Sequence, residues 1–208
     1  MIKELIGPGI VVYRNVFSDT DSLIRRYEKV LGKEESSWVS AETNEDGVPQ
    51  NLGRNCKDFV YDRPQDDEND ERSIELRSLY DIVLDPIKES LKDYEKDFPV
   101  TVEYFESLNI IKYEPNDFFN YHTDDGKHSR YTVSCVGYLN DDYEGGQLHF
   151  KFLNVLYTPR SGDLVVFPSA YIYAHAAYPV RKGTKYIVAL MTDRTVEGHR
   201  NKYAERIG

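Results

Sequence analysis

Apolar residues recur at helical spacing in two stretches of the first hundred residues. The first stretch follows Ser18 and Asp19, either of which can cap a helix, and it ends at Gly32. The second begins near Arg72, and its apolar stripe is interrupted by Pro86. The apolar positions are Leu23, Ile24, Tyr27, Val30 and Leu31, then Ile74, Leu76, Leu79, Tyr80, Val83, Leu84, Ile87 and Leu91. Such stripes normally face a core, so we predict two packing helices without a chemical role.

After Thr101 the pattern changes to short apolar runs separated by turn residues. Seven candidate strands follow one another without a long helix between them, which predicts an antiparallel sandwich or jelly roll. They span Glu106 to Tyr113, Tyr131 to Leu139, Gln147 to Phe152, Val155 to Thr158, Leu164 to Phe167, Ala174 to Tyr178 and Lys185 to Thr192. We expect one mainly β domain with α over 1–208. Its double-stranded β-helix (jelly-roll) core covers 101–193, a helical N-terminal support and loop cover 1–100, and a polar tail covers 194–208.

The polar stretch from Ala41 to Glu71 lies between the two predicted helices and shows no clear periodicity. A segment of this length is usually functional or mobile, so it is either a substrate-covering loop or a solvated linker. Trp38, Arg54 and Tyr61 flank or occupy this stretch and are weak candidates for substrate contacts.

The composition is that of a globular chain large enough to bury a core, with 208 residues, 40% apolar and 30% charged. No run approaches the ~20 apolar residues of a membrane span, and the N-terminal residues lack the apolar core of a signal peptide. We therefore expect a cytoplasmic protein in which Cys56 and Cys135 are free thiols. A net charge of −10 argues against binding to nucleic acid, which usually takes clustered Lys and Arg.

His122, Asp124 and His175 are the candidate metal ligands. Two imidazoles and one carboxylate on one face of a metal, with the other face open, suit the oxygen chemistry of non-haem Fe(II). A His-x-Asp triplet alone is a weak signal, because it also arises by chance in solvated loops. This triplet, however, lies just past the predicted strand that ends at Tyr113, where a pleated scaffold can direct side chains into a pocket.

Several short motifs accompany these ligands in order along the chain. They are His122-Thr123-Asp124, Tyr138-Leu139-Asn140-Asp141, Gly145-Gly146-Gln147-Leu148-His149-Phe150, Pro159-Arg160-Ser161-Gly162-Asp163-Leu164-Val165-Val166-Phe167, His175 and Pro179-Val180-Arg181-Lys182-Gly183-Thr184-Lys185. In this combination, from Leu108 to Thr192, the chain resembles the Fe(II)- and 2-oxoglutarate-dependent dioxygenases, especially their prolyl 4-hydroxylase-like branch.

The resemblance implies that His122, Asp124 and His175 hold Fe(II), with 2-oxoglutarate and O2 as cosubstrates and ascorbate as a candidate reductant. It also implies that Lys185 pairs with the distal carboxylate of 2-oxoglutarate, and that Tyr113 donates a hydrogen bond to this cosubstrate. The physical requirement is mutual, because a dicarboxylate in a narrow pocket needs a cation at its far end and a buried lysine needs an anion.

The strand pattern supports an inward position for this lysine. Lys185 shares a strand face with Ile187 and Ala189 by period two, which places it among apolar neighbours. Arg181 and Lys182 are the rival cations. They lie beside a turn glycine, where we expect solvated side chains.

Two positions depart from the family pattern. Asn116 stands where a glycine is common, and Leu148 stands where a threonine often follows the Gly-Gly pair. Asparagine tolerates the left-handed backbone of a turn glycine, so the first change need not disturb the loop. We expect Cys135 to be a packed small side chain. The remaining histidines are expected to have no metal-binding role; they are His128, His149 and His199.

The expected reaction, by resemblance, hydroxylates a prolyl or similar residue of a peptide and releases succinate and CO2. Asp124 favours hydroxylation, because Ala or Gly there would indicate the family's halogenating variant. A free amino acid or small metabolite is the second substrate candidate, and the oligomeric state stays open. Two other classes also stay open: a jelly-roll interaction protein that binds metal without turnover, and a Zn(II) enzyme that activates water. Lys185 and Tyr113 favour the oxygenase, since neither rival needs a clamp for a distal carboxylate.

Overall fold

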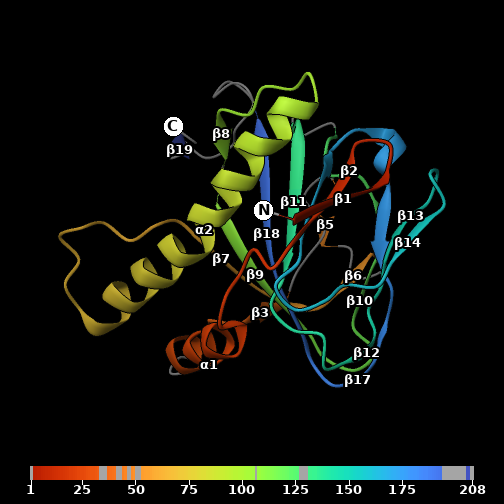
Figure 1. Cartoon of the computed structure of the whole chain (residues 1–208). Helices are drawn as coiled ribbons and strands as arrows, with labels where there is room; N and C mark the ends of the chain where they lie inside the picture. The colour runs from red at the N-terminus through yellow and green to blue at the C-terminus, as the bar shows by residue number, and fades with distance from the viewer. Residues whose placement is uncertain are drawn as a thin grey trace.

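The computed structural model describes residues 2–32, 37–40, 44–45, 48–49, 53–105, 107–126, 131–193 and 205–206. Two helices lie on one side of a large antiparallel sheet, and a smaller antiparallel sheet lies on its other side (Figure 1). The predicted mainly β jelly-roll fold with supporting helices is confirmed.

Both predicted helices are present. α1 (Thr20–Leu31) begins after Asp19, whose backbone is left-handed (φ 46°) and whose side chain makes no capping hydrogen bond. α2 (Glu71–Asp97) begins after Asp70, whose carboxylate accepts hydrogen bonds from two N–H groups of the first turn. Pro86 lies inside α2 and does not end it. Within the described residues, neither helix is long and apolar enough to cross a membrane.

The large sheet has the strand order β1-β2-β15-β11-β18-β9-β7-β3, and β8 and β19 pair beside β18. These strands are β1 (Ile2–Gly7), β2 (Ile10–Arg14), β3 (Val39–Ser40), β7 (Lys57–Tyr61), β8 (Tyr104–Phe105), β9 (Leu108–Tyr113), β11 (Val133–Tyr138), β15 (Leu164–Pro168), β18 (Lys185–Asp193) and β19 (Glu205–Arg206).

The small sheet has the order β14-β13-β16-β10-β6. Its strands are β6 (Arg54–Asn55), β10 (Phe118–His122), β13 (Leu148–Phe150), β14 (Val155–Tyr157) and β16 (His175–Ala177). Two short ribbons and a 3-10 turn complete the described elements: β4 (Asn44–Glu45) with β5 (Val48–Pro49), β12 (Glu144–Gly145) with β17 (Val180–Lys182), and η1 (Tyr171–Tyr173).

The N-terminal part is less helical than expected, because it also supplies strands to both sheets. β2 pairs with β15 and β7 pairs with β9, while β6 pairs with β10 in the small sheet. The short apolar run that forms β2 cannot be told from a buried helix segment by periodicity alone. Residues 41–43, 46–47 and 50–52 of the expected lid or linker lie outside the described residues, as does most of the expected tail.

Two apolar cores result from this layering. On β18, Val188 and Leu190 face the core between the helices and the large sheet, whereas Ile187 and Ala189 face the core between the two sheets. The strand alternation predicted for this segment is therefore confirmed. The core between the sheets contains the cavity described next.

Candidate active site

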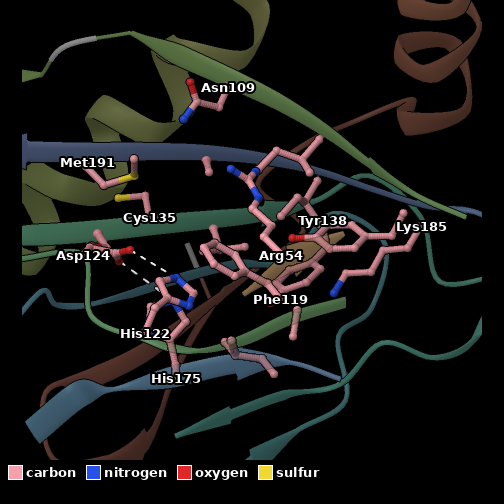
Figure 2. Close-up of a pocket in the computed structure, with 18 residues that line it drawn as sticks. Arg54, Asn109, Phe119, His122, Asp124, Cys135, Tyr138, His175, Lys185 and Met191 are labelled. Carbon is pink, nitrogen blue, oxygen red and sulfur yellow. Dashed lines mark ion pairs between the residues drawn. The ribbon is translucent and has the colours of Figure 1, made fainter. Parts of the chain in front are cut away.

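The three predicted metal ligands converge at one end of a cavity between the sheets (Figure 2). His122 ends β10 and His175 begins β16, and the antiparallel pairing of these strands places the two histidines opposite each other. The ligand atoms of these residues and Asp124 all lie within 4.8 Å of one another. Nε2 of His122 is 3.5 Å from one carboxylate oxygen of Asp124, and Nε2 of His175 is 3.9 Å from the other.

Backbone carbonyl groups orient both imidazole rings. Nδ1 of His122 lies 2.9 Å from the carbonyl oxygen of Asn120, and Nδ1 of His175 lies 3.1 Å from that of Tyr173. Because a carbonyl only accepts hydrogen bonds, each Nδ1 carries the proton and donates it. Each Nε2 therefore keeps its lone pair for a metal.

Electrostatic interactions favour the metal-binding protonation states. Burial raises the pKa of the Asp124 carboxyl, but the imidazoles of His175 and His122 outweigh burial and hold this pKa well below its usual range. Burial lowers the pKa of His175 to about 4, although Asp124 partly opposes this. At neutral pH these residues present a carboxylate and a neutral imidazole, as a non-haem Fe(II) site requires.

The strand that ends at Tyr113 is followed by a turn at 114–117, in agreement with the sequence. Residues 118–122 then form a further strand, β10, which was not predicted, and the His-x-Asp triplet begins at its last residue. Asn116, in this turn, has φ 77°, which is the left-handed backbone expected where the family often has glycine. The sequence Phe-Phe-Asn-Tyr-His of β10 lacks a clear apolar and polar alternation, so it was not recognised as a strand.

Lys185 lies at the other end of the same cavity (Figure 2). Its side chain is 1% exposed, and its Nζ donates a hydrogen bond of 2.7 Å to the carbonyl oxygen of Gly146. The rings of Tyr113, Tyr138 and Tyr143 surround the ammonium group at 5.1 to 5.9 Å. Burial lowers the pKa of Lys185 to about 7, and no described carboxylate forms an ion pair with it.

Tyr113 and Lys185 are opposite each other in the pairing of β9 with β18, so the two predicted cosubstrate contacts lie side by side. The Tyr113 hydroxyl is hydrogen-bonded to the buried thiol of Cys56. The rival cations Arg181 and Lys182 are both exposed, and the prediction that they are solvated is confirmed.

Arg54, a weak candidate for a substrate contact in the sequence, lines the cavity. Its side chain is 12% exposed. Its guanidinium lies 4.8 Å above the ring of Phe119, which in turn stacks on His122 at 3.5 Å. It also contacts the thiol of Cys56 at 3.1 Å and a carboxylate oxygen of Asp58 at 3.2 Å. β6 therefore brings a second cation to the cavity, through a strand pairing that the sequence did not predict.

The other residues singled out in the sequence have different surroundings. Trp38 and Tyr61 pack in the core on the helix side of the large sheet, away from the cavity. His149 is hydrogen-bonded to the exposed Tyr121, and the ligand cluster found among the described residues does not include it. Cys135 is a free thiol that is buried as predicted, although it also lines the cavity, and burial raises its pKa. His128 and His199 lie outside the described residues.

Fold and site together define a class of protein: a jelly roll with two histidines and one carboxylate around an open position, as in non-haem iron oxygenases. Residues 108–192 match the family model of the 2OG-Fe(II) oxygenase superfamily. The predicted family is confirmed. The family and the His122, Asp124 and His175 triad together imply Fe(II) and 2-oxoglutarate, and the geometry above fits both.

Known proteins with similar sequence or fold carry prolyl hydroxylase names. The chain is 27% identical over 124 residues to a mimivirus protein named "Putative prolyl 4-hydroxylase", and it spans about half the length of that relative (51%). That match covers 50% of the present chain.

Three solved structures share the fold. A viral collagen prolyl hydroxylase from Paramecium Bursaria Chlorella virus-1 has a TM-score of 0.63 at 18% identity, covering 89% of this chain and 96% of that one. A Pseudomonas putida prolyl-4-hydroxylase has a TM-score of 0.63 at 21% identity, covering 90% of this chain and 93% of that one. A Trichoplax adhaerens prolyl hydroxylase has a TM-score of 0.67 at 17% identity, covering 88% of this chain and 83% of that one. That structure holds a peptide fragment of hypoxia inducible factor.

Proposed function

We propose that this protein is an Fe(II)- and 2-oxoglutarate-dependent dioxygenase that hydroxylates a prolyl or similar residue of a peptide, with release of succinate and CO2. The observation that carries the proposal is the presence of two incomplete sites in one cavity. At one end, three ligands leave part of a metal's coordination sphere open, and at the other end the buried Lys185 lacks an anionic partner among the described residues. A short dicarboxylate that chelates the metal completes both sites.

The residues of the cavity would divide the work between them. Iron held by His122, Asp124 and His175 would supply oxygen activation coupled to oxidative decarboxylation of the cosubstrate. Lys185 would hold the distal carboxylate and fix the direction in which the dicarboxylate lies. Leu148 and the inward side of β18 provide apolar walls that limit the access of water to this region.

The peptide substrate class is supported by the names of the relatives and by the peptide bound to the Trichoplax enzyme. A free amino acid is the competing substrate class. The two classes can be separated by direct assay.

The first experiment is an anaerobic titration of the Fe(II)-loaded protein with 2-oxoglutarate, followed by the visible metal-to-ligand charge-transfer band. We expect a saturable band that is lost in His175→Ala and needs far more 2-oxoglutarate in Lys185→Met. Lys182→Met, which removes an exposed cation, is the matched control and should titrate like the wild type. A folded, iron-loaded protein without a band would contradict the oxygenase proposal and favour a binding protein or a Zn(II) hydrolase.

The second experiment supplies O2 and compares the blocked pentapeptide acetyl-Ala-Ala-Pro-Ala-Ala-amide with free proline. Succinate release and the gain of one oxygen atom, measured by mass spectrometry, report hydroxylation. Peptide hydroxylation supports the proposed substrate class, whereas hydroxylation of free proline alone would replace it with the amino acid class.

A further inference from the structure

One buried polar atom in the cavity wall has no hydrogen-bond partner among the described residues. Asn109 is the second residue of β9 and lines the cavity, and its Oδ1 atom is buried without a hydrogen bond to any described residue. Asparagine is depleted in strands, and a buried amide oxygen without a partner is destabilising. Asn109 is unfavourable on both counts and faces a ligand cavity. We therefore expect that a bound ligand supplies the hydrogen bond that the Asn109 oxygen lacks.

The strand register places Asn109 at the metal end of the cavity. Asn109 is opposite Ala189, whereas Tyr113 is opposite Lys185, so about 13 Å of strand separates the amide from the lysine end. On the other side of β18, Met191 is opposite Ser134, whose hydroxyl is hydrogen-bonded to Asp124. In Figure 2, Met191 lies on the same side as the triad, Asn109 lies at the upper edge of the view, and Lys185 lies at the opposite side. A dicarboxylate held between Lys185 and the metal therefore leaves Asn109 on the substrate side.

The charges in the cavity indicate that this substrate group is neutral. The positive charges of Fe(II), Lys185 and Arg54 equal the negative charges of Asp124, a bound 2-oxoglutarate and Asp58, which does not line the cavity but pairs with Arg54. Once both cofactors are bound, no excess charge remains for a charged substrate group to balance. The atom that lacks a hydrogen bond at the substrate side is the oxygen of an uncharged amide, Asn109. Another amide matches it in polarity and in hydrogen bonding.

We propose that Asn109 determines specificity by pairing its side-chain amide with a peptide group of the substrate, with Oδ1 accepting a hydrogen bond from a backbone N–H. This inference rests on the proposed function and names the substrate feature that the site recognises. A prolyl residue within a peptide has no N–H of its own, so the donor belongs to the residue next to the target. A free amino acid offers an ammonium group instead.

The test is a double-mutant cycle that combines one substitution in the protein with one change in the peptide. The measured quantity is the affinity for the peptide. The probes are acetyl-Ala-Ala-Pro-Ala-Ala-amide and the same peptide methylated on the nitrogen that follows the proline. Binding is followed anaerobically through the change that each peptide causes in the Fe(II) and 2-oxoglutarate charge-transfer band. We expect methylation to weaken binding to the wild type about tenfold and to have no further effect in Asn109→Leu, as coupled partners require.

Two controls separate recognition from a structural role. Met191→Leu changes the same wall without removing a polar group and should keep the tenfold effect of methylation. Asn109→Leu should unfold, without ligands, at the same temperature as the wild type or higher, because it removes a buried amide oxygen that lacks a hydrogen bond. A clear fall in its unfolding temperature would show that the amide stabilises the fold and would overturn the inference.

The remaining outcomes distinguish this inference from the proposed function. If methylation weakens binding equally in the wild type and in Asn109→Leu, Asn109 does not contact that N–H and the inference alone fails. If the unmethylated peptide leaves the band of the wild type unchanged while free proline alters it, the peptide substrate class fails and the inference fails with it.

Discussion

The affinity for 2-oxoglutarate should fall steeply as pH rises through the neutral range, because the lysine that would bind its distal carboxylate is buried. Burial lowers the pKa of Lys185 to about 7, so in the free protein this amine loses its proton near pH 7. A carboxylate binds the ammonium form, and its charge raises the pKa in the complex. Every unit of pH above the free pKa then reduces the observed affinity by up to tenfold.

The expected magnitude follows from that single ionisation. Between pH 6.5 and 8.5, the protonated fraction of a group with a pKa of about 7 falls about 25-fold, which corresponds to about 1.9 kcal/mol of binding free energy. Burial keeps two neighbouring groups outside this interval, since the pKa of His175 is about 4 and that of Cys56 is about 11. The Lys185→Arg variant then tests whether the slope belongs to Lys185.

Anaerobic titrations of the Fe(II) protein at four or five pH values would measure this dependence. Lys185→Arg supplies a cation that keeps its charge throughout, so its affinity should be lower overall but nearly independent of pH. Lys182→Ala should keep the full 25-fold dependence. A wild-type affinity that does not change with pH, or the same slope in Lys185→Arg, would refute the assignment of this ionisation to Lys185.

Three further outcomes are expected. Lys185→Met should raise the unfolding temperature of the ligand-free protein by a few degrees, because it removes an unpaired buried cation, and a fall in differential scanning fluorimetry would contradict this. Asp124→Ala should weaken Fe(II) binding at least ~100-fold in a competition assay with a chelating dye, and unchanged affinity would exclude Asp124 as a ligand. Asp70→Ala should cost about 1 kcal/mol by removing the cap of α2, seen as an unfolding temperature about 2–4 °C lower, while 2-oxoglutarate binding stays unchanged. A loss of binding in Asp70→Ala would show that α2 affects the cavity more directly than its packing indicates.

The metal triad and the lysine could be predicted because their signals are local. The spacing within His122-Thr123-Asp124 and the alternation from Lys185 to Ala189 depend on neighbouring residues in one or two strands. The apolar stripes of both helices are local in the same sense, and both helices form where the sequence placed them.

The parts of the site that could not be predicted depend on pairings between distant segments. Arg54 reaches the cavity only because β6 pairs with β10, and nothing near Arg54 in the sequence specifies that partner. Asn109 shares a face with Tyr113 by period two, so its inward direction could have been inferred. That its amide oxygen lacks a partner among the described residues depends on three strands, which only the folded structure brings together.

The two histidine ligands and the carboxylate ligand differ in how readily evolution can replace them. His122 and His175 face each other on paired strands, so the register of a sheet sets their spacing before any metal binds. Asp124 lies beyond the end of β10, and a hydroxyl from the large sheet holds it. Replacing either histidine alters a paired position of the sheet, whereas replacing Asp124 leaves every strand pairing intact. A descendant of this chain could therefore exchange its carboxylate for a small residue, admit an external anion to the metal, and acquire a different reaction on the same scaffold.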